Sequence, residues 1–330
     1  MKNTGNSCNF PIDLVYLWVD GNDAAWRAKK NKYSGNVQDD KALSEARFRS
    51  NDELKYSLRS VEKFAPWINR VFIVTDNQCP EWLNTGNAKI QIIDHSQIFP
   101  AVALPVFNST AIEAVLHKIP GLSEHFLYGN DDMLLVAPVK PFDYFDEDGR
   151  PIVRLSGQTF DRKKALHKDV YRRMLVRMQD MVQRTHGVLI PHAPHHNIDA
   201  YCKSTYKQCL EGFGDLWNTT VHNRFRRDND IHRSVVSYFM VATGCGVLRK
   251  VGRYNRTGGF WQSVKAFFIG RFASDSRTVP VSAKSYESIM RKYNPLMLCV
   301  NDDERATDDD CRRMVAFLEK LFPTKSVFEK

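Results

Sequence analysis

The sequence predicts an α/β fold in which helices cover both faces of a mostly parallel sheet. Two observations lead to this prediction. Four short β-like runs within the first 140 residues are almost continuously apolar, and helix-like segments lie between them. Strands buried on both faces have this composition, and parallel strands need connections of this kind. In such sheets, ligands bind beyond the carboxyl ends of the strands.

The predicted strands are aliphatic and aromatic runs, and they cover residues 12–19, 70–76, 90–95 and 125–136. A helix is predicted over residues 50–66, because apolar side chains recur at helical spacing from Leu54 onward. Ser50 and Glu53 have the spacing of a capping box at its start, and Pro66 ends it. A second helix is expected over residues 108–120, before the fourth strand.

After residue 148 the sequence becomes basic and the predicted elements are mainly helices. The remaining predicted elements are a basic amphipathic helix over 161–184, a helix ending near Leu210, a hydrophobic helix over 235–244, a strand over 295–300 and a final helix over 307–322. Thr307 and the acidic residues after it are typical of a helix start. We therefore expect three regions: an α/β half at 1–148, a basic, mainly helical region at 149–285, and a return strand and helix at 286–330 that complete the core.

Composition narrows the class of protein. No apolar run reaches the roughly 18 residues that a membrane span needs, and the first residues have no signal-peptide core. Seven cysteines without a CxxC pair argue against a disulfide framework and a zinc site, which leaves reduced thiols. The net charge is +9, and residues 150–184 hold ten Lys or Arg against three Asp. That stretch indicates an anionic partner or a solvated basic face.

Polar side chains lie at or near the carboxyl ends of several of the predicted strands. They are Asp20, Asp76, Asp94 and the run Asn130 to Asp132. Carboxylate oxygens are the ligands that Mg²⁺ or Mn²⁺ prefers, and these cations accompany chemistry on nucleoside diphosphates. The strand ends therefore predict a divalent cation site, with a solvated loop start as the alternative interpretation.

Asp131 and Asp132 are adjacent in the fourth predicted strand. Neighbouring side chains on a strand point to opposite faces, so we expect one carboxylate to face the metal while the other anchors the loop. Two further segments carry candidate chemistry. His192 and His195 lie beside prolines that stiffen a loop, where an imidazole can take a proton from a hydroxyl. Arg224 lies in a segment that also holds Arg226 and Arg227, and these side chains either clamp phosphate or neutralise Asp228 and Asp230.

Five motifs in order resemble one protein family. They are "IDLVYLWVDGND", "RFRSNDELKYSLRSVEKFAPWINRVFIVTDNQCPEWL", "HFLYGNDDM", "HAPH" with "NRFRRDND", and "CVNDD". Together they resemble the Stealth proteins, which are capsular polysaccharide phosphotransferases. The Stealth proteins are in turn similar to the catalytic subunit of the lysosomal-enzyme N-acetylglucosamine-1-phosphotransferase. The resemblance covers residues 12 to 305. It implies a Rossmann-like, glycosyltransferase-A-like core with a helical acceptor-side region, in which residues 1–148 bind the nucleotide sugar.

The resemblance also implies a reaction. A sugar 1-phosphate would pass from a UDP-sugar to an acceptor hydroxyl of a capsular polysaccharide, with formation of a phosphodiester and release of UMP. It implies a divalent cation, Mg²⁺ or Mn²⁺, as cofactor, and no nucleic acid partner. The location implied is cytoplasmic, either free or associated peripherally with the inner membrane or the capsule assembly machinery.

Site residues follow from the matching positions. The catalytic residues implied are His192, Asp131, Asp302 and Arg226. The substrate-binding residues implied are Asp20, Gly21, Asn22, Asp23, Arg59, Asn108, Asn130, Arg224 and Asn301. Asp131 and Asp132 match the metal segment. His192 would act as the base toward the acceptor, helped by Asp302, and Arg226 would bind phosphate.

Two other functions remain compatible with the residues. A conventional metal-dependent glycosyltransferase would use the same UDP-sugar but release UDP. A non-catalytic module would bind polyanions through the basic stretch at 150–184. Basic and aromatic residues interleave over 251–272, as in a membrane-surface or acceptor-binding patch, or a core helix with basic edges.

Overall fold

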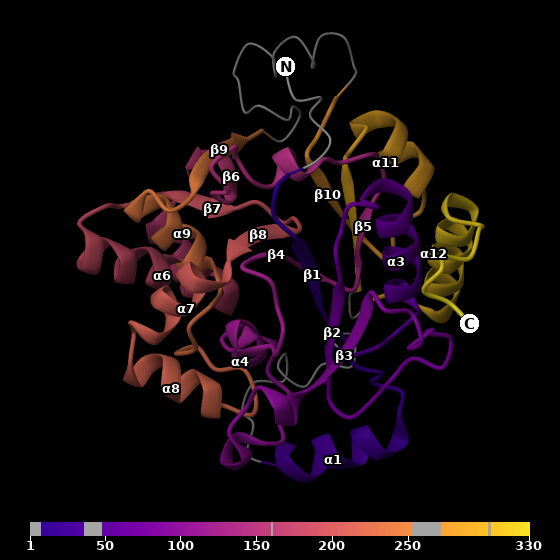
Figure 1. Cartoon of the computed structure of the whole chain (residues 1–330), viewed down its shortest axis with the longest axis horizontal. Helices are drawn as coiled ribbons and strands as arrows, with labels where there is room; N and C mark the ends of the chain where they lie inside the picture. Colours follow the sequence, from indigo (N-terminus) through magenta and orange to yellow (C-terminus); the bar gives the residue numbers. More distant parts are fainter. Residues whose placement is uncertain (1–7, 36–47, 160, 253–271, 303–304) are drawn as a thin grey trace.

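The structure is a computed structural model that describes residues 8–35, 48–159, 161–252, 272–302 and 305–330 (Figure 1). Its strands are β1 Ile12–Leu17, β2 Val71–Thr75, β3 Ile90–Asp94, β4 His125–Asn130, β5 Met133–Leu135, β6 Ile152–Thr159, β7 His192–Pro194, β8 Asp199–Cys202, β9 Val247–Val251, β10 Ser276–Pro280 and β11 Met297–Asn301. Its helices are α1 Ala24–Ser34, α3 Glu53–Phe64, α4 Ser109–Glu113, α5 Arg162–Leu166, α6 Val170–His186, α7 Lys203–Glu211, α8 Asp215–His222, α9 Ser234–Thr243, α11 Tyr286–Tyr293 and α12 Asp308–Leu321.

The principal sheet has the strand order β3-β2-β1-β4-β8. The first four strands are parallel, and β8 runs antiparallel to β4. This confirms the predicted mostly parallel α/β sheet. Successive side chains of β1 enter different cores: Val15 packs with α4, α7 and α9, whereas Leu14 packs with α3. Figure 1 shows the sheet between α3 on one side and α4, α7 and α9 on the other.

Two smaller sheets complete the fold, with the orders β10-β11-β5 and β7-β6-β9. The prediction of one continuous strand over 125–136 is therefore wrong. It divides at Asp131 and Asp132 into β4, in the principal sheet, and β5, which pairs antiparallel with β11. The two carboxylates occupy the turn between these strands. The return strand β11 was predicted, and it brings the end of the chain beside this turn.

The basic helix expected over 161–184 is also divided. α5 ends at Leu166, and α6 begins at Val170, because the carboxylate of Asp169 accepts a hydrogen bond from the backbone N–H of Arg172 over 2.9 Å. Leu166, the last residue of α5, is 49% exposed. The helix expected over 108–120 contains α4 and a short 3₁₀ turn at Leu116–Lys118 instead of one continuous α-helix.

The capping box predicted at Ser50 and Glu53 does not form. Asp52 precedes α3 with a φ of 64°, and its side chain makes no capping hydrogen bond. Glu53 instead accepts hydrogen bonds from the backbone N–H and the side-chain amide of Asn51, over 2.7 and 2.8 Å. The predicted start of the last helix is confirmed, because Thr307 and Asp310 form a capping box at α12.

The region 149–285 contains strands that the sequence did not indicate. β6, β7 and β9 form a sheet of their own, and β8 joins the principal sheet. The segment of His192, expected as a loop, is the short strand β7. The basic and aromatic patch at 251–272 lies almost wholly outside the described residues. Among those that are described, no helix is both long and apolar enough to cross a membrane.

Candidate active site

The carboxyl ends of the parallel strands meet at one edge of the principal sheet. Leu17 of β1 is in register with Val74 of β2 and with Asn130 of β4, so the segments that follow these strands emerge together. Tyr128 fixes Asn130 from within β4, because its hydroxyl contacts the Asn130 amide oxygen at 3.2 Å and Glu113 at 2.9 Å. This edge is where a doubly covered α/β sheet places its ligands.

Asp131 and Asp132 form the turn at this edge. Their expected placement on a strand, with side chains on opposite faces, is wrong because a turn replaces the strand there. β11 holds Asp132 in two ways: the N–H of Val300 donates to its carbonyl over 3.0 Å, and the thiol of Cys299 donates to its Oδ2 over 3.2 Å. Its second carboxylate oxygen, Oδ1, is enclosed and meets no hydrogen-bond donor among the described residues.

Glu53 adds a third carboxylate from the start of α3, and we call Glu53, Asp131 and Asp132 the carboxylate cluster. Desolvation, then the charges of Asp132 and Glu53, raise the pKa of Asp131 well above its usual value. Desolvation and Glu53 raise the pKa of Asp132 to about 7, although the Cys299 hydrogen bond opposes this. Desolvation also raises the pKa of Glu53. Carboxylates gathered in this way repel one another unless a positive charge joins them.

A divalent cation fits this donor set. Desolvation and neighbouring carboxylates disfavour the charged forms of Asp131 and Asp132 in the absence of a cation, and Asp132 Oδ1 has no hydrogen-bond donor among the described residues. Within the described ranges, no three His, Cys, Asp or Glu side chains converge into a complete ligand set. Mg²⁺ does not require one, because it is usually bound by one or two carboxylates together with water and substrate phosphate. Asp131 and Asp132 are therefore suitable ligands.

Asp302 lies next to this cluster. Its carboxylate pairs with Arg49 at 3.3 Å and contributes to the raised pKa of Glu53. Arg49 also donates to the sulfur of Cys311 over 3.4 Å, which ties the pair to α12. Asn301, at the end of β11, is exposed, and its amide donates to the Asp302 carbonyl over 3.1 Å. The structure thus brings the "CVNDD" segment to the "GNDD" turn.

Three histidines follow one another along the segment from β7 to β8. His192 is buried, its carbonyl accepts from the hydroxyl of Tyr238 over 3.0 Å, and its Nδ1 has no partner among the described residues. His195 contacts the hydroxyl of Ser276 at 3.0 Å. His196 contacts the sulfur of Cys299 at 3.2 Å, so it is the histidine that reaches the carboxylate cluster through a bonded neighbour.

The arginine segment is fixed to the start of α4. Asn108 caps α4 through Thr110 and donates to the buried carboxylate of Asp230 over 2.8 Å. Arg226 donates to the hydroxyl of Ser109 over 2.6 Å, and Arg224 donates to a backbone carbonyl over 3.1 Å. The Nε atoms of both arginines are enclosed and meet no acceptor in the described part of the chain.

The turn after β1 is held both by its own contacts and by Gln78, whose side-chain amide accepts from the Asp20 N–H over 2.9 Å and donates to the Asp20 carbonyl over 3.1 Å. Asp20 accepts from the N–H of Asn22 over 2.8 Å, and Asp23 caps α1 by accepting from Trp26 over 2.7 Å. Gly21 approaches the backbone of Phe48 so closely that a Cβ there would lie 2.1 Å from the Phe48 carbonyl oxygen. Asn22 is exposed, and its side chain is the one in this turn that is most open to a ligand.

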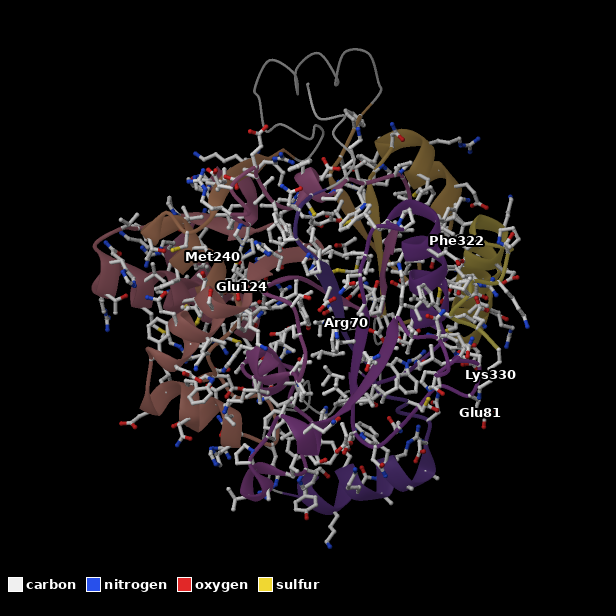
Figure 2. The ribbon with its side chains drawn as sticks, in the orientation of Figure 1. Arg70, Glu81, Glu124, Met240, Phe322 and Lys330 are labelled. Atoms are coloured by element: carbon white, nitrogen blue, oxygen red, sulfur yellow. The ribbon has the colours of Figure 1, made fainter. Side chains whose placement is uncertain are left out.

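Arg59 does not join the predicted substrate-binding residues. It is 7% exposed, and its guanidinium binds Glu329 at 2.8 Å, Glu319 at 3.0 Å and the carbonyl of Phe322 at 2.6 Å. Figure 2 places Phe322 beside α3 and α12, at the edge of the molecule where the chain ends. Its contacts are those of a structural residue that anchors the C-terminal segment to α3.

Two cavities flank α1. One, of about 570 Å³, lies against the ends of β2 and β3, and its polar lining includes Lys29, Lys32, Asp76, Asp94 and His95. The other, of about 440 Å³, adjoins the Gly21 turn and includes Arg27, Lys30, Arg49 and Asp308. Both bring basic side chains to the sheet edge that carries the carboxylates.

The sequence did not indicate Glu53, Arg49, Cys299 or His196 as site residues. Glu53 matched a helix-capping pattern, and a cysteine within an apolar strand looks like core. The sequence did contain one signal that the two regions lie together, namely the repeated Asp-Asp pairs in "GNDD" and "VNDD".

Solved structures resemble this chain loosely. A galactosyltransferase LgtC, crystallised with donor and acceptor sugar analogues, aligns with a TM-score of 0.42 and 11% identity, covering 96% of this chain and 98% of that one. Mouse xyloside xylosyltransferase 1 aligns with a TM-score of 0.38 and 11% identity, covering 88% and 98%.

Sequence relatives match over almost the whole chain. The exopolysaccharide phosphotransferase cps2G of Lactiplantibacillus plantarum is 34% identical, over 97% of each protein. The capsular polysaccharide phosphotransferase WcwK of Streptococcus pneumoniae is 31% identical, over 96% of this chain and 99% of that protein. The exopolysaccharide phosphotransferase SCO6023 of Streptomyces coelicolor is 35% identical over 97% of this chain, which spans about half of that longer protein (53%). Residues 10–38 match Stealth protein conserved region 1, and residues 47–153 match conserved region 2. The chain therefore belongs to the Stealth protein family.

Proposed function

We propose that this protein transfers a sugar 1-phosphate from a UDP-sugar to a hydroxyl of a capsular or exopolysaccharide acceptor, forming a phosphodiester and releasing UMP. The names of its relatives support polysaccharide phosphotransfer. The carboxylate cluster is the structural observation that carries the proposal. Partly desolvated carboxylates with raised pKa values, one with an unpartnered oxygen, suit a cation that accompanies a diphosphate.

Asp131 and Asp132 would hold the divalent cation, and Glu53 would add negative charge behind them. When bound, the cation supplies positive charge that offsets the charge of the donor diphosphate. The cavity between α1 and the ends of β2 and β3 has room for the nucleoside, and Lys29 and Lys32 line it. We propose that the donor extends from this cavity across β1 to the turn after β4.

Arg224 and Arg226 would bind phosphate oxygens through their guanidinium groups. His192 would accept the proton of the acceptor hydroxyl, with its unpartnered Nδ1 as the candidate atom. The acceptor oxygen then forms a bond to the β-phosphorus, and the bond between that phosphorus and the bridging oxygen of UMP breaks. The sugar's anomeric C–O bond stays intact, so its configuration is unchanged.

Incubation with a panel of UDP-sugars, acceptor and Mg²⁺ or Mn²⁺ tests the proposal by chromatography of the nucleotide products. We expect UMP. Release of UDP with a plain glycosidic product would instead identify a conventional glycosyltransferase. We expect Asp131→Ala, His192→Ala and Arg226→Ala to abolish turnover without unfolding the protein. The matched control Asp148→Ala removes a carboxylate whose side chain is 79% exposed and should leave turnover unchanged.

A further inference from the structure

The carboxylate of Asp132 has two unlike oxygens. Oδ2 accepts the thiol hydrogen of Cys299 over 3.2 Å, whereas Oδ1 is enclosed and has no hydrogen-bond donor among the described residues. A carboxylate rotates about its Cβ–Cγ bond unless one oxygen is fixed. The contact at Oδ2 therefore decides where Oδ1 points.

Cys299 is well placed to fix that oxygen. It is 3% exposed in the middle of β11, and its backbone is in register with Met133, the residue directly after Asp132. The next residue, Val300, donates its N–H to the Asp132 carbonyl over 3.0 Å. β11 thus contacts both the backbone and the side chain of Asp132.

His196 contacts the same thiol from the segment that follows β7. Its Nε2 lies 3.2 Å from the sulfur. A thiol has one hydrogen, and since that hydrogen is directed to Asp132, the sulfur is left as an acceptor for the N–H at Nε2. The backbone of His196 is itself fixed, because its carbonyl accepts a hydrogen bond from Ser276 of β10, and the side chain of the next residue, Asn197, donates to Asp275.

We propose that Cys299 and His196 are positioning residues that direct Oδ1 of Asp132 toward the cation. The N–H of His196 donates to the sulfur of Cys299, and the thiol of Cys299 donates to Oδ2 of Asp132. The proposal rests on the cation site of the proposed function, and it does not depend on the identity of the sugar donor. Partners behind a metal ligand commonly change metal affinity about 10- to 100-fold when they are removed.

Binding of Mn²⁺ alone, and of Mn²⁺ with UDP, followed by electron paramagnetic resonance of the free ion, tests the role of the thiol. Cys299→Ala and Cys299→Val lack the donor, and valine also restores volume in the strand. We expect both to raise the Kd for Mn²⁺ about tenfold or more. Cys299→Ser keeps a donor and should stay within about threefold of the wild type. Cys209→Ala is the matched control, since Cys209 is 2% exposed and packs in the apolar core.

A double-mutant cycle tests the role of the imidazole. His196→Leu should weaken Mn²⁺ binding when Cys299 is present, and His196→Gln, which keeps an N–H of similar reach, should restore part of it. In the Cys299→Ala background, His196→Leu should have no further effect, because the imidazole acts only through the sulfur. Equal effects of His196→Leu in both backgrounds would overturn the chain of contacts.

Unchanged Mn²⁺ affinity in folded Cys299→Ala and Cys299→Val would overturn the inference, as would a wild type that binds no Mn²⁺ with or without UDP. The measurement needs no turnover, so the two proposals fail separately. Absence of UMP release together with the expected Mn²⁺ pattern would refute the proposed reaction alone. UMP release together with indifferent Mn²⁺ affinities would refute the positioning role alone.

Discussion

Cys299 and Asp132 lie 167 positions apart in the chain, and a thiol–carboxylate hydrogen bond of 3.2 Å joins them. The contact links the turn after β4, in the first half of the protein, to the last strand of the fold. The orientation of Asp132 within the carboxylate cluster therefore involves β11, the strand that pairs with β5.

Asp131→Asn should abolish turnover without lowering the thermal midpoint of the metal-free protein. The substitution removes a charge that desolvation and two neighbouring carboxylates disfavour. Asp13→Asn is the contrasting variant. Asp13 is fully buried, and its carboxylate accepts from Asn69, Arg70 and Ser123 over 2.8, 3.2 and 2.8 Å; Arg70 lies near the centre of Figure 2.

We expect Asp13→Asn to lose about 1–3 kcal/mol of stability, because the substituted amide cannot accept from every donor. Paired calorimetric scans, with activity measured below the transition, check both variants. A large destabilisation by Asp131→Asn would show that its carboxylate has a structural partner.

Arg59→Leu should destabilise the protein by about 3–5 kcal/mol, because it leaves Glu329, whose side chain is 3% exposed, without its partner. The KM for the sugar donor should stay unchanged at temperatures where the variant is folded. Denaturant titration and steady-state kinetics measure the two effects. An increased KM at unchanged stability would return Arg59 to the donor site, where its motif originally placed it.

Gly21→Ala should lower kcat/KM at least about tenfold, since a Cβ placed 2.1 Å from the Phe48 carbonyl oxygen must displace the turn after β1. That turn also carries a hydrogen bond of 2.8 Å from the Gly21 N–H to the same oxygen. Gly35→Ala is the control, because nothing lies within 4 Å of its added Cβ. Equal kinetics for the two variants would mean that the turn tolerates movement.

His95 should make the protein less stable in mild acid. Desolvation lowers the pKa of this 2% exposed imidazole to about 4, against the opposing charges of Asp76 and Asp94 and with a smaller contribution from Lys29. The unfolded chain binds a proton near pH 6.5, whereas the folded protein does not until about pH 4. Stability from this group is therefore complete above pH 6.5 and is lost as pH falls toward 4.

From pH 7 to pH 5 the expected loss from His95 is about 2 kcal/mol. His95→Leu should reduce the acid loss by that amount in urea titrations at the two pH values. His222→Leu, at an exposed position, should leave it unchanged. The same acid loss in His95→Leu as in the wild type would assign it to another group.

The sheet and its functional edge were predictable because their signals are local. Buried parallel strands are continuous apolar runs, and Asp94 and Asn130 end two of them while Asp20 lies shortly after a third. The break between β4 and β5 at Asp131 was harder to predict from the sequence. An apolar run on both sides of two carboxylates reads as one strand, and only the pairing of β5 with β11 separates it into two.

Other residues depend on contacts that no local pattern contains. Glu53 fits a capping box by spacing, but its carboxylate accepts a hydrogen bond from the backbone N–H of Asn51. The fold also brings Glu53 near enough to Asp131 for its charge to raise the pKa of Asp131. Arg59 lies within the longest of the family motifs, yet its partner Glu329 is 270 positions away. In the sequence, Cys299 lies within an apolar run and is indistinguishable from a core residue. Its contact with the Asp132 carboxylate becomes visible only in the fold.

The path of the β-phosphorus is the most direct test of the central claim. A UDP-sugar labelled with ³²P at the β-phosphate is incubated with acceptor and Mn²⁺, and the polysaccharide and nucleotide fractions are separated. Phosphoryl transfer predicts that the label enters the polysaccharide in a phosphodiester while unlabelled UMP accumulates. Label that stays in the nucleotide as UDP, with sugar but no phosphorus in the polymer, would contradict it.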